Sequence, residues 1–230
     1  AGFAASSGDI ICFLAADDYF SEGKVARIVE ELNAHESAGW LFHSLEDVDE
    51  KGARLRDAAP LDSGYFDFQQ VMRRGGNVPA LPATTGLCFR REVLEKTLPM
   101  SESIRISADQ FLRLSATFSA PGVLLPEPMA VHRIHGANLF EARKDTAVLS
   151  ADTNVRTAYY LRSRFPQMKT FANGMFAHSL GQLLAGRGSS TLKMQEVKQY
   201  IREYWTLDVW PESVSRLLFN YLKTLRGSFA

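Results

Sequence analysis

The sequence contains little cysteine and no long apolar run. Its 230 residues include two cysteines, Cys12 and Cys88, and each lies inside a short apolar segment, which favours buried, reduced thiols over a disulfide or a zinc site. No segment approaches the roughly 18 consecutive apolar residues of a membrane-spanning helix, and the N-terminus lacks the basic segment and apolar core of a signal peptide. These absences indicate a protein of the reducing cytoplasm.

An excess of charge of either sign is also missing, because 26 lysines and arginines balance 26 aspartates and glutamates. Without a net field the chain has no general attraction for nucleic acid, so no nucleic-acid partner is expected. The sequence also lacks a glycine-rich phosphate loop and the elbow of a serine or cysteine nucleophile. The chemistry must therefore rest on acidic residues and histidines.

The first half of the chain alternates strand and helix patterns. Residues 9–14 and 40–45 are short apolar runs typical of strands covered on both faces, and residues 21–34 between them have helical spacing. The helix is expected to begin at an N-cap at Ser21 and to bury one face, which consists of Val25, Ile28, Val29 and Leu32. Strand, helix and strand in this order indicate an α/β sheet.

The remaining patterns divide the chain into an α/β part, residues 1–140, and a helical part, residues 141–230. In the first part we expect a hairpin return at 53–56, a surface excursion over 57–82 with a short helix at 66–74, strands at 84–89, 123–125 and 129–134, and helices at 90–98 and from near Asp109 to before Pro121. In the second part we expect four helices, at 145–164, 167–186, 191–205 and 211–226.

Asp17 and Asp18 directly follow the first predicted strand. The carboxyl end of a strand is the edge where open α/β sheets bind ligands, and carboxylate oxygens there suit Mg²⁺ or Mn²⁺ completed by a substrate's phosphates. Two acids before a helix can equally well satisfy amide donors and complement the helix dipole. From spacing alone both interpretations stay open.

A third acid and two histidines are further candidates. Asp109 falls in the first turn of its helix, where the helix dipole alone explains an acid, although a positioned carboxylate there can also act as a general base. His132 and His135 are three residues apart, so in an extended chain they point to opposite faces and at most one can be a metal ligand. His135, before Gly136 at the strand end, is the better ligand candidate, and His132 is expected to pack or to form a hydrogen bond.

Five segments together, in order and spacing, resemble family 2 glycosyltransferases of the GT-A fold. They are residues 8–18, 21–25, 85–94, 107–112 and 127–136. The resemblance covers residue 1 to about 138 and implies a partial GT-A mixed sheet, followed by a C-terminal helical subdomain. It implies transfer of a sugar, with inversion, from a nucleotide-diphosphate donor to a carbohydrate or lipid-linked acceptor.

The resemblance also assigns roles to residues on the donor side. Asp17 matches the family's metal-ligand position, with Asp18 beside it in the donor site, and the metal is Mn²⁺ or Mg²⁺. His135 matches a histidine near the donor diphosphate and the metal. The metal would neutralise charge on the departing nucleoside diphosphate.

On the acceptor side, Asp109 matches the catalytic base that deprotonates the acceptor hydroxyl, and Thr85 and Gly86 match binding residues that line the site. Two positions depart from the family pattern: Ala15 replaces the first acid of Asp-x-Asp-Asp, and Ala108 replaces the glutamate before the base. The family's first β-α units would precede Ala1. We therefore expect a fragment or remnant with weak or no activity as an isolated polypeptide.

The same departures favour a second hypothesis, an inactive module that binds a partner protein or lies at the inner face of a membrane. A sheet edge without a neighbour would also favour self-association. The helical part carries aromatic residues that could form such a surface, or could equally be its own core. They are Tyr200, Tyr204, Trp205, Trp210 and Phe219, interleaved with Arg202, Arg216, Lys223 and Arg226.

Overall fold

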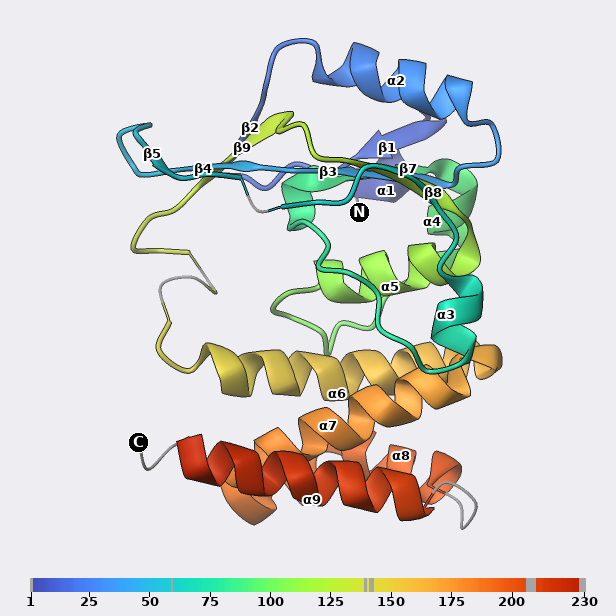
Figure 1. The fold of residues 1–230 in the computed structure, drawn as a ribbon, viewed down its shortest axis with the longest axis vertical. Coiled ribbons are helices and arrows are strands. Elements are labelled where there is room, and N and C mark those ends of the chain that lie inside the picture. The colour runs from blue at the N-terminus through green and yellow to red at the C-terminus, as the bar shows by residue number, and fades with distance from the viewer. Residues whose placement is uncertain (1, 59, 139, 141–142, 206–209, 228–230) are drawn as a thin grey trace. The chain divides into compact units, whose positions relative to one another are not determined.

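The computed structural model describes residues 2–58, 60–138, 140, 143–205 and 210–227 (Figure 1). The chain forms two compact units, each described here by itself. The first consists of residues 1–70, 78–100 and 112–138, and the second of residues 71–77, 101–111 and 139–230. The α/β class and the helical C-terminal part expected from the sequence are both confirmed.

A five-stranded mixed sheet forms the centre of the first unit, in the order β1-β7-β3-β8-β6. β3 and β8 are parallel and the other neighbouring pairs are antiparallel. Helix α2 (Lys24–Ala34) covers one face and α4 (Arg91–Thr97) lies on the other (Figure 1). The strands are β1 (Ile10–Cys12), β7 (Leu87–Arg90), β3 (Trp40–His43), β8 (Gly122–Leu125) and β6 (Gly64–Phe66).

The apolar runs of β3 and β8 form strands because both faces of each are covered. All four residues of each strand are buried, and Leu41 is paired with Val123 across the parallel register. On the α2 side, Ile28 and Leu32 pack with Leu41, Val123 and their neighbours in one apolar cluster. This core fixes the position of β1 and of the turn that follows it.

A second, four-stranded sheet joins two distant parts of the chain, in the order β2-β9-β4-β5. β2 runs antiparallel to β9, with Tyr19 opposite Val131 and Phe20 opposite Ala130. Because the two strands run in opposite directions, residues just before Tyr19 lie beside residues just after Val131. The strands are β2 (Tyr19–Phe20), β9 (Ala130–Arg133), β4 (Glu46–Val48) and β5 (Arg54–Arg56).

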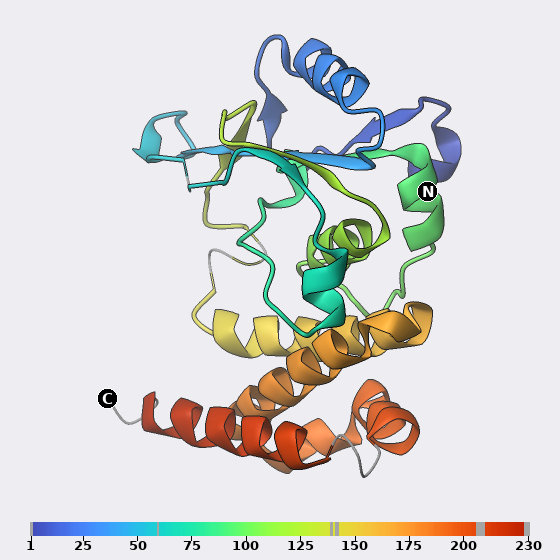
Figure 2. The same ribbon diagram turned by 45° about the vertical axis from the view of Figure 1, so that its right-hand side comes forward.

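The second unit contains the four helices expected from the sequence, and α7 packs against both α6 and α9 (Figures 1 and 2). The aromatic residues of its tail are mostly core: Tyr200 is buried and stacks on Phe176 with ring centroids 3.8 Å apart, and Tyr204 and Trp205 pack against the same cluster. The side chain of Trp210 lies outside the described residues. The helices are α6 (Thr146–Arg164), α7 (Lys169–Arg187), α8 (Gln195–Tyr204) and α9 (Trp210–Gly227).

Several further helices and turns complete the two units. Among the described residues, no helix has the length and apolar character that crossing a bilayer requires. Helix α5 begins at Asp109, where the sequence placed it. These elements are α1 (Gly2–Ala5), α3 (Gln69–Arg73), α5 (Asp109–Ser119), and the 3₁₀ turns η1 (Thr84–Gly86), η2 (Pro166–Met168) and η3 (Gly188–Lys193).

The expected start and buried face of the first long helix are wrong in part. Ser21 is not the N-cap, because α2 begins at Lys24 after Gly23, which adopts the left-handed conformation with φ 77°. The buried face runs through Lys24, Ile28 and Leu32, whereas Val25 and Val29 are exposed. The short strand β2 occupies Tyr19 and Phe20, so the chain needs the extra residues before it can turn into the helix.

Two further elements differ from the sequence-based expectation. The excursion over 57–82 contains β6, which pairs with β8 and forms an edge of the main sheet. Residues 84–86, expected as the start of a strand, form the 3₁₀ turn η1 instead, so that β7 begins at Leu87. A strand of three residues among proline, aspartate and serine is too short to show an alternation of apolar and polar residues. The sequence therefore did not predict β6.

Candidate functional site

Thr85 is the centre of a buried hydrogen-bond network at the end of β1. Its hydroxyl accepts a hydrogen bond from the backbone N–H of Ala15 (3.1 Å) and donates one to the Asp18 carboxylate. Its carbonyl oxygen accepts a hydrogen bond from the ammonium group of Lys24 (2.9 Å). The turn that carries Asp17 and Asp18 is therefore tied to η1 and α2 through one threonine.

Asp18 is held at both carboxylate oxygens. Oδ2 accepts the hydroxyl hydrogen of Thr85, and Oδ1 accepts the backbone N–H of Arg133 at 3.0 Å. The side chain thus links the turn after β1 to β9 as well as to η1. In this geometry Asp18 positions its neighbour, and its assignment to the donor site remains a prediction.

Lys24 is a residue of this network that the sequence analysis did not single out. Its side chain is only 2% exposed, and its ammonium group lies 3.6 Å from the ring centroid of Phe20. Burial lowers the pKa of Lys24, and this effect is opposed by the thiols of Cys88 and Cys12 and the carboxylate of Asp18. A lysine in register with Ile28 and Leu32, on a face that must be apolar, is the signal that could have found it.

The two cysteines lie opposite each other on β1 and β7, close to the same lysine. Both are free; Cys88 is buried, as expected, and Cys12 is half-buried. The hydrogen bond with Cys88 lowers the pKa of the Cys12 thiol to about 7; burial works against this and the charge of Lys24 supports it. Lys24 therefore interacts electrostatically both with Asp18 and with the two cysteines of β1 and β7.

Asp17 lies against His135 and Asn138, two residues that follow β9. Its Oδ2 is 2.9 Å from Nε2 of His135 and accepts a longer hydrogen bond, 3.3 Å, from the amide of Asn138. Nδ1 of His135 accepts the backbone N–H of Ala137 at 3.2 Å, so the ring proton belongs on Nε2 and points at Asp17. The carboxylate of Asp17 is thereby oriented by a histidine and an amide.

Asp17 also remains accessible, with 38% of its side chain exposed. Among the described residues, its second oxygen, Oδ1, has no hydrogen-bond partner. The pairing of β2 with β9 explains why residues so far apart in the sequence meet here. Asn138, which holds both Asp17 and the backbone N–H of His135, was not predicted from the sequence.

The residues present suit a divalent cation whose coordination is completed by water and a bound phosphate, and not a cation held by protein side chains alone. The described part of the chain holds no group of three or more histidine, cysteine, aspartate or glutamate side chains able to bind a metal alone. Asp17 and His135 supply one carboxylate and one imidazole. Mg²⁺ and Mn²⁺ accept such sites when water and phosphate oxygens complete the shell. To bind, His135 must release its Nε2 proton.

His132 belongs to a different pair. Its Nδ1 is 2.9 Å from Oδ1 of Asp47, whose Oδ2 accepts a hydrogen bond from Arg56 at 2.5 Å. Asp47 is the register partner of His132 across β4 and β9. His132 is therefore a hydrogen-bonding residue, as expected, and only His135 joins Asp17.

Gly86 has a packing reason for lacking a side chain. A Cβ atom there would lie 2.6 Å from the carbonyl oxygen of His43 and 2.8 Å from the Cβ of Pro82. This close packing holds η1 against β3, next to the Thr85 hydroxyl that bonds Asp18. The binding role of Gly86 stays a prediction.

Asp109, the predicted base, belongs to the second unit, whereas Asp17, Asp18 and His135 belong to the first. Asp109 is the half-buried first residue of α5. The turn before it contains Ser107 in the left-handed conformation, with φ 51°. This turn is anchored within its own unit by a hydrogen bond of 2.9 Å from Thr153 to the carbonyl of Ile106.

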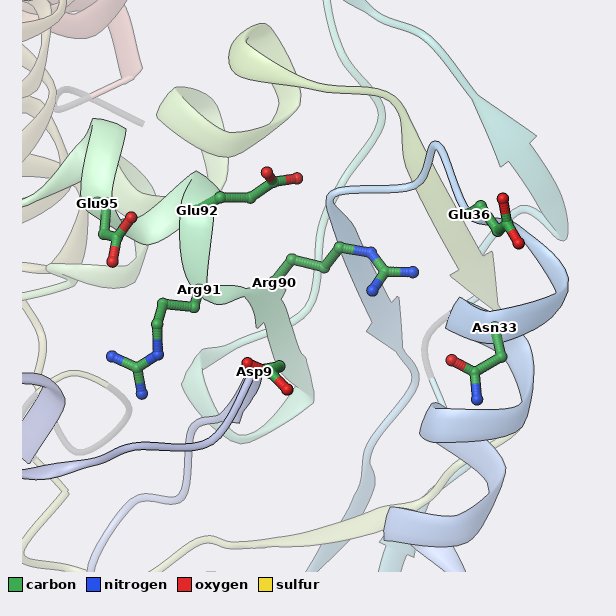
Figure 3. Close-up of a pocket in the computed structure, with 7 residues that line it drawn as sticks. All are labelled: Asp9, Asn33, Glu36, Arg90, Arg91, Glu92 and Glu95. Carbon is green, nitrogen blue, oxygen red and sulfur yellow. The ribbon is translucent and has the colours of Figure 1, made fainter.

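A cavity of about 630 Å³ in the first unit lies beside β1 and β7. Figure 3 shows Arg90 directed toward α2 and Arg91 directed the opposite way. Both guanidinium groups are engaged by backbone carbonyls: Arg90 binds Leu32 (2.6 Å) and Arg91 binds Gly8 (2.8 Å). Its lining is Asp9, Asn33, Glu36, Arg90, Arg91, Glu92 and Glu95, none of them a predicted site residue.

Replacing Thr85 with valine is expected to lower the free energy of unfolding by about 2 kcal/mol, because it leaves Asp18 and the Ala15 amide without their shared partner. Thr157→Val is the matched control, since the buried Thr157 hydroxyl has no hydrogen-bond partner among the described residues. Its replacement is expected not to lower the free energy of unfolding, because it removes a buried hydroxyl that forms no hydrogen bond. Urea unfolding checks both; equal effects would contradict the network.

Comparison with known proteins agrees with the resemblance found in the sequence. The family model for glycosyl transferase family 2 matches residues 1–98. The chain is 30% identical over 224 residues to an uncharacterized glycosyltransferase of Nostoc sp., covering 96% of this chain and 66% of that protein. It is 23% identical over 240 residues to EpsJ, an uncharacterized glycosyltransferase of Bacillus subtilis, covering 98% and 68%.

Among solved structures, the crystal structure of S. aureus TarS residues 1–349 in complex with UDP-GlcNAc aligns with a TM-score of 0.49 and 11% identity, covering 99% of this chain and 69% of that one. The chain thus spans about two thirds of the length of the relatives that it matches. From the family match and the similarity to the Nostoc protein over 96% of this chain, the chain belongs to the family 2 glycosyltransferases.

Proposed function

We propose that this chain contributes the diphosphate site and the base of a metal-dependent, inverting glycosyltransferase that uses a nucleotide-sugar donor. The observation that carries the proposal is the accessible carboxylate of Asp17, oriented by His135 and Asn138 at the carboxyl end of β1. An oriented acid with one open oxygen suits a cation shared with a diphosphate.

The network beneath Asp17 supports this role by fixing where its carboxylate lies. Asp18 is held at both oxygens, by Thr85 and by the backbone of Arg133, so the two adjacent acids have different tasks. The ammonium group of Lys24 donates to the carbonyl of Thr85 and offsets the negative charge of Asp18. Such preorganised polar groups stabilise charge without having to rearrange during a reaction.

In the proposed reaction Asp109 accepts the proton of the acceptor hydroxyl. The acceptor oxygen forms a bond to the anomeric carbon of the donor, and the bond from that carbon to the diphosphate oxygen breaks with its electron pair, which inverts the configuration. A bound Mg²⁺ or Mn²⁺, held by Asp17 and His135, would neutralise the charge on the departing nucleoside diphosphate. The acceptor is a carbohydrate or lipid-linked hydroxyl.

The second candidate is a binding module without transferase activity. Ala15 and Ala108 favour it, because the family pattern has acids at both positions. In the structure Ala15 bonds through its backbone: its N–H donates to Thr85, and its carbonyl accepts the N–H of Asp18. A module of this kind keeps the fold and the Thr85 network but does not bind a nucleotide with a metal.

The test is calorimetric titration of UDP, in the presence and absence of Mn²⁺, into wild type, Asp17→Asn and Asp9→Asn. Asp17→Asn is expected to weaken the Mn²⁺-dependent binding at least about tenfold, because it removes the anionic ligand. Asp9→Asn is the matched control, since Asp9 lies just before the other end of β1 and lines the separate cavity.

The outcomes separate the two candidates. Binding that needs Mn²⁺ and is lost only in Asp17→Asn supports the transferase. Absence of UDP binding in folded wild type, or equal binding in Asp17→Asn, contradicts it and favours the module. Repeating the titration with GDP shows whether the protein recognises the diphosphate or the nucleobase.

A further inference from the structure

Helix α9 packs against α7 with Leu217 beside the apolar core of the unit, but two small polar side chains also point inward and three large apolar side chains point outward. Ser213 and Asn220 are buried, whereas Leu218, Phe219 and Leu222 are 51%, 65% and 51% exposed. The exposed positions of a helix on the surface of a globular protein are normally polar. Three adjacent large apolar side chains on one helix face therefore require an explanation.

The close approach of the two helices fixes this orientation. A Cβ atom on Gly181 of α7 would lie 2.5 Å from the carbonyl oxygen of Leu217 and 3.0 Å from the backbone nitrogen of Tyr221, so the two backbones meet there. The amide of Asn220 donates a hydrogen bond of 2.7 Å to the carbonyl of Arg216. Turning α9 about its axis would bring a larger leucine or phenylalanine side chain to the place beside Gly181 where Asn220 now lies.

The same helix carries more basic than acidic residues. Arg216, Lys223 and Arg226 lie on α9, and Glu212 is the one acidic residue in its sequence. Burial, together with the charges of Lys223 and Arg216, lowers the pKa of His178 on α7. Lys223 and Arg226 are exposed, as are the three apolar residues.

These features distinguish between possible occupants of the surface. A second copy of the chain, docked through the same face, would bring two sets of cations together, and like charges in contact are costly. An anionic lipid surface accepts both components, because leucine and phenylalanine enter the boundary of the acyl chains while lysine and arginine reach the phosphates. The charge of α9 therefore favours lipid.

We propose that α9 is an interfacial helix that docks on an anionic membrane through Leu218, Phe219 and Leu222, with Lys223 and Arg226 at the headgroups. The helix lies in the plane of the interface. This inference goes beyond the proposed transferase and does not depend on it, since it rests on residues of α7 and α9 alone.

The first test is co-sedimentation of the full chain with vesicles of phosphatidylcholine containing about 30% phosphatidylserine, against vesicles of phosphatidylcholine alone. Each cation near an anionic surface contributes about 1 kcal/mol, so binding to the anionic vesicles is expected to be at least about fivefold stronger. Raising the salt concentration is expected to reduce that difference, because it screens the charges. Wild type that stays in the supernatant with anionic vesicles would overturn the proposal.

The second test removes the apolar part. Phe219→Ser with Leu222→Ser is expected to weaken vesicle binding about tenfold, and both positions are exposed, so the fold is retained. The matched control is Leu192→Ser with Ile201→Ser, two apolar residues of the same unit that are also exposed. Equal losses in the two double variants, or no loss in the α9 variant, would overturn the role of α9.

A third variant tests the charges. Lys223→Glu with Arg226→Glu is expected to abolish the preference for phosphatidylserine, whereas Lys193→Glu with Lys198→Glu, on exposed residues elsewhere in the second unit, is expected to retain it. Sedimentation velocity without lipid tests the second copy: self-association that the α9 variants abolish, with no vesicle binding, would overturn the membrane proposal. UDP binding in solution is expected to be unchanged in every α9 variant, so the two proposals can fail separately.

Discussion

Replacing Asp109 with asparagine is expected to lower the rate of sugar transfer by about 10²–10⁴-fold and to leave Mn²⁺-dependent UDP binding unchanged. Asparagine keeps the shape of aspartate but cannot accept a proton at neutral pH, so a general base is lost while packing is retained. The measurement is the rate of UDP release from a UDP-sugar with Mn²⁺ and a carbohydrate acceptor, beside the affinity for UDP.

The structure around Asp109 favours a carboxylate held in place. A carboxylate is a modest base at neutral pH, so its contribution depends on being positioned on the proton that it removes. Asp109 begins α5 directly after a turn in which Ser107 has φ 51°, and Thr153 of α6 fixes the carbonyl of Ile106 in that turn. A tethered turn of this kind limits the positions that the first side chain of the helix can take.

Asp145→Asn provides a matched control for this prediction. Asp145 is the N-cap of α6, so both substitutions remove an acid from the start of a helix, at a cost of about 0.3–1 kcal/mol in stability. Its carboxylate pairs with Arg143 at 2.7 Å, and we assign it no part in transfer. Equal loss of rate in the two variants, or a rate for Asp109→Asn within about threefold of wild type, would show that Asp109 acts through the helix and not as a base.

The sequence predicted those features that depend on neighbouring residues. The apolar runs of β3 and β8, the start of α5 and the four C-terminal helices all have a local period or a local boundary, and the structure contains each of them. The predicted start of α2 is wrong for a non-local reason. Ser21 has the chemistry of an N-cap, but Tyr19 and Phe20 pair with β9, and that pairing moves the helix start to Lys24.

The candidate site shows the same division more sharply. Asp17 and His135 were singled out separately, and only the resemblance to a family suggested that they belong together. Their contact depends on the antiparallel pairing of β2 with β9, between segments more than 100 residues apart, which no local period reveals. Lys24 and Asn138 were missed for this reason, because each matters only through partners brought by the fold.

Lowering the pH from 7 to about 4 is expected to reduce the free energy of unfolding of the first unit by about 3 kcal/mol through His43 alone. His43 is fully buried at the end of β3. Its Nδ1–H donates a hydrogen bond of 2.8 Å to the carbonyl of Ser44, and its Nε2 has no partner among the described residues. A proton added at Nε2 would therefore be buried without an acceptor.

The direction of the effect follows from these surroundings. Burial, and then the positive charge of Lys24, lower the pKa of His43 from 6.5 to about 4, while the hydrogen bond to Ser44 opposes them. Between pH 6.5 and about pH 4, His43 is protonated in the unfolded chain and neutral in the folded chain. Stability is therefore complete above pH 6.5, falls as the pH is lowered, and levels off below about pH 4.

Two substitutions isolate this histidine from the carboxylates that titrate over the same range. His43→Gln and His43→Leu differ in the hydrogen bond to Ser44, so their stabilities at pH 7 are expected to differ, by about 1 kcal/mol. Neither side chain titrates, so both variants should lose the same part of the pH dependence, whatever their stability at neutral pH. Urea unfolding between pH 4 and pH 7 measures this difference. A variant whose stability declines as steeply as that of the wild type would show that His43 accepts its proton in the folded protein, with Lys24 or β3 moving to accommodate the charge.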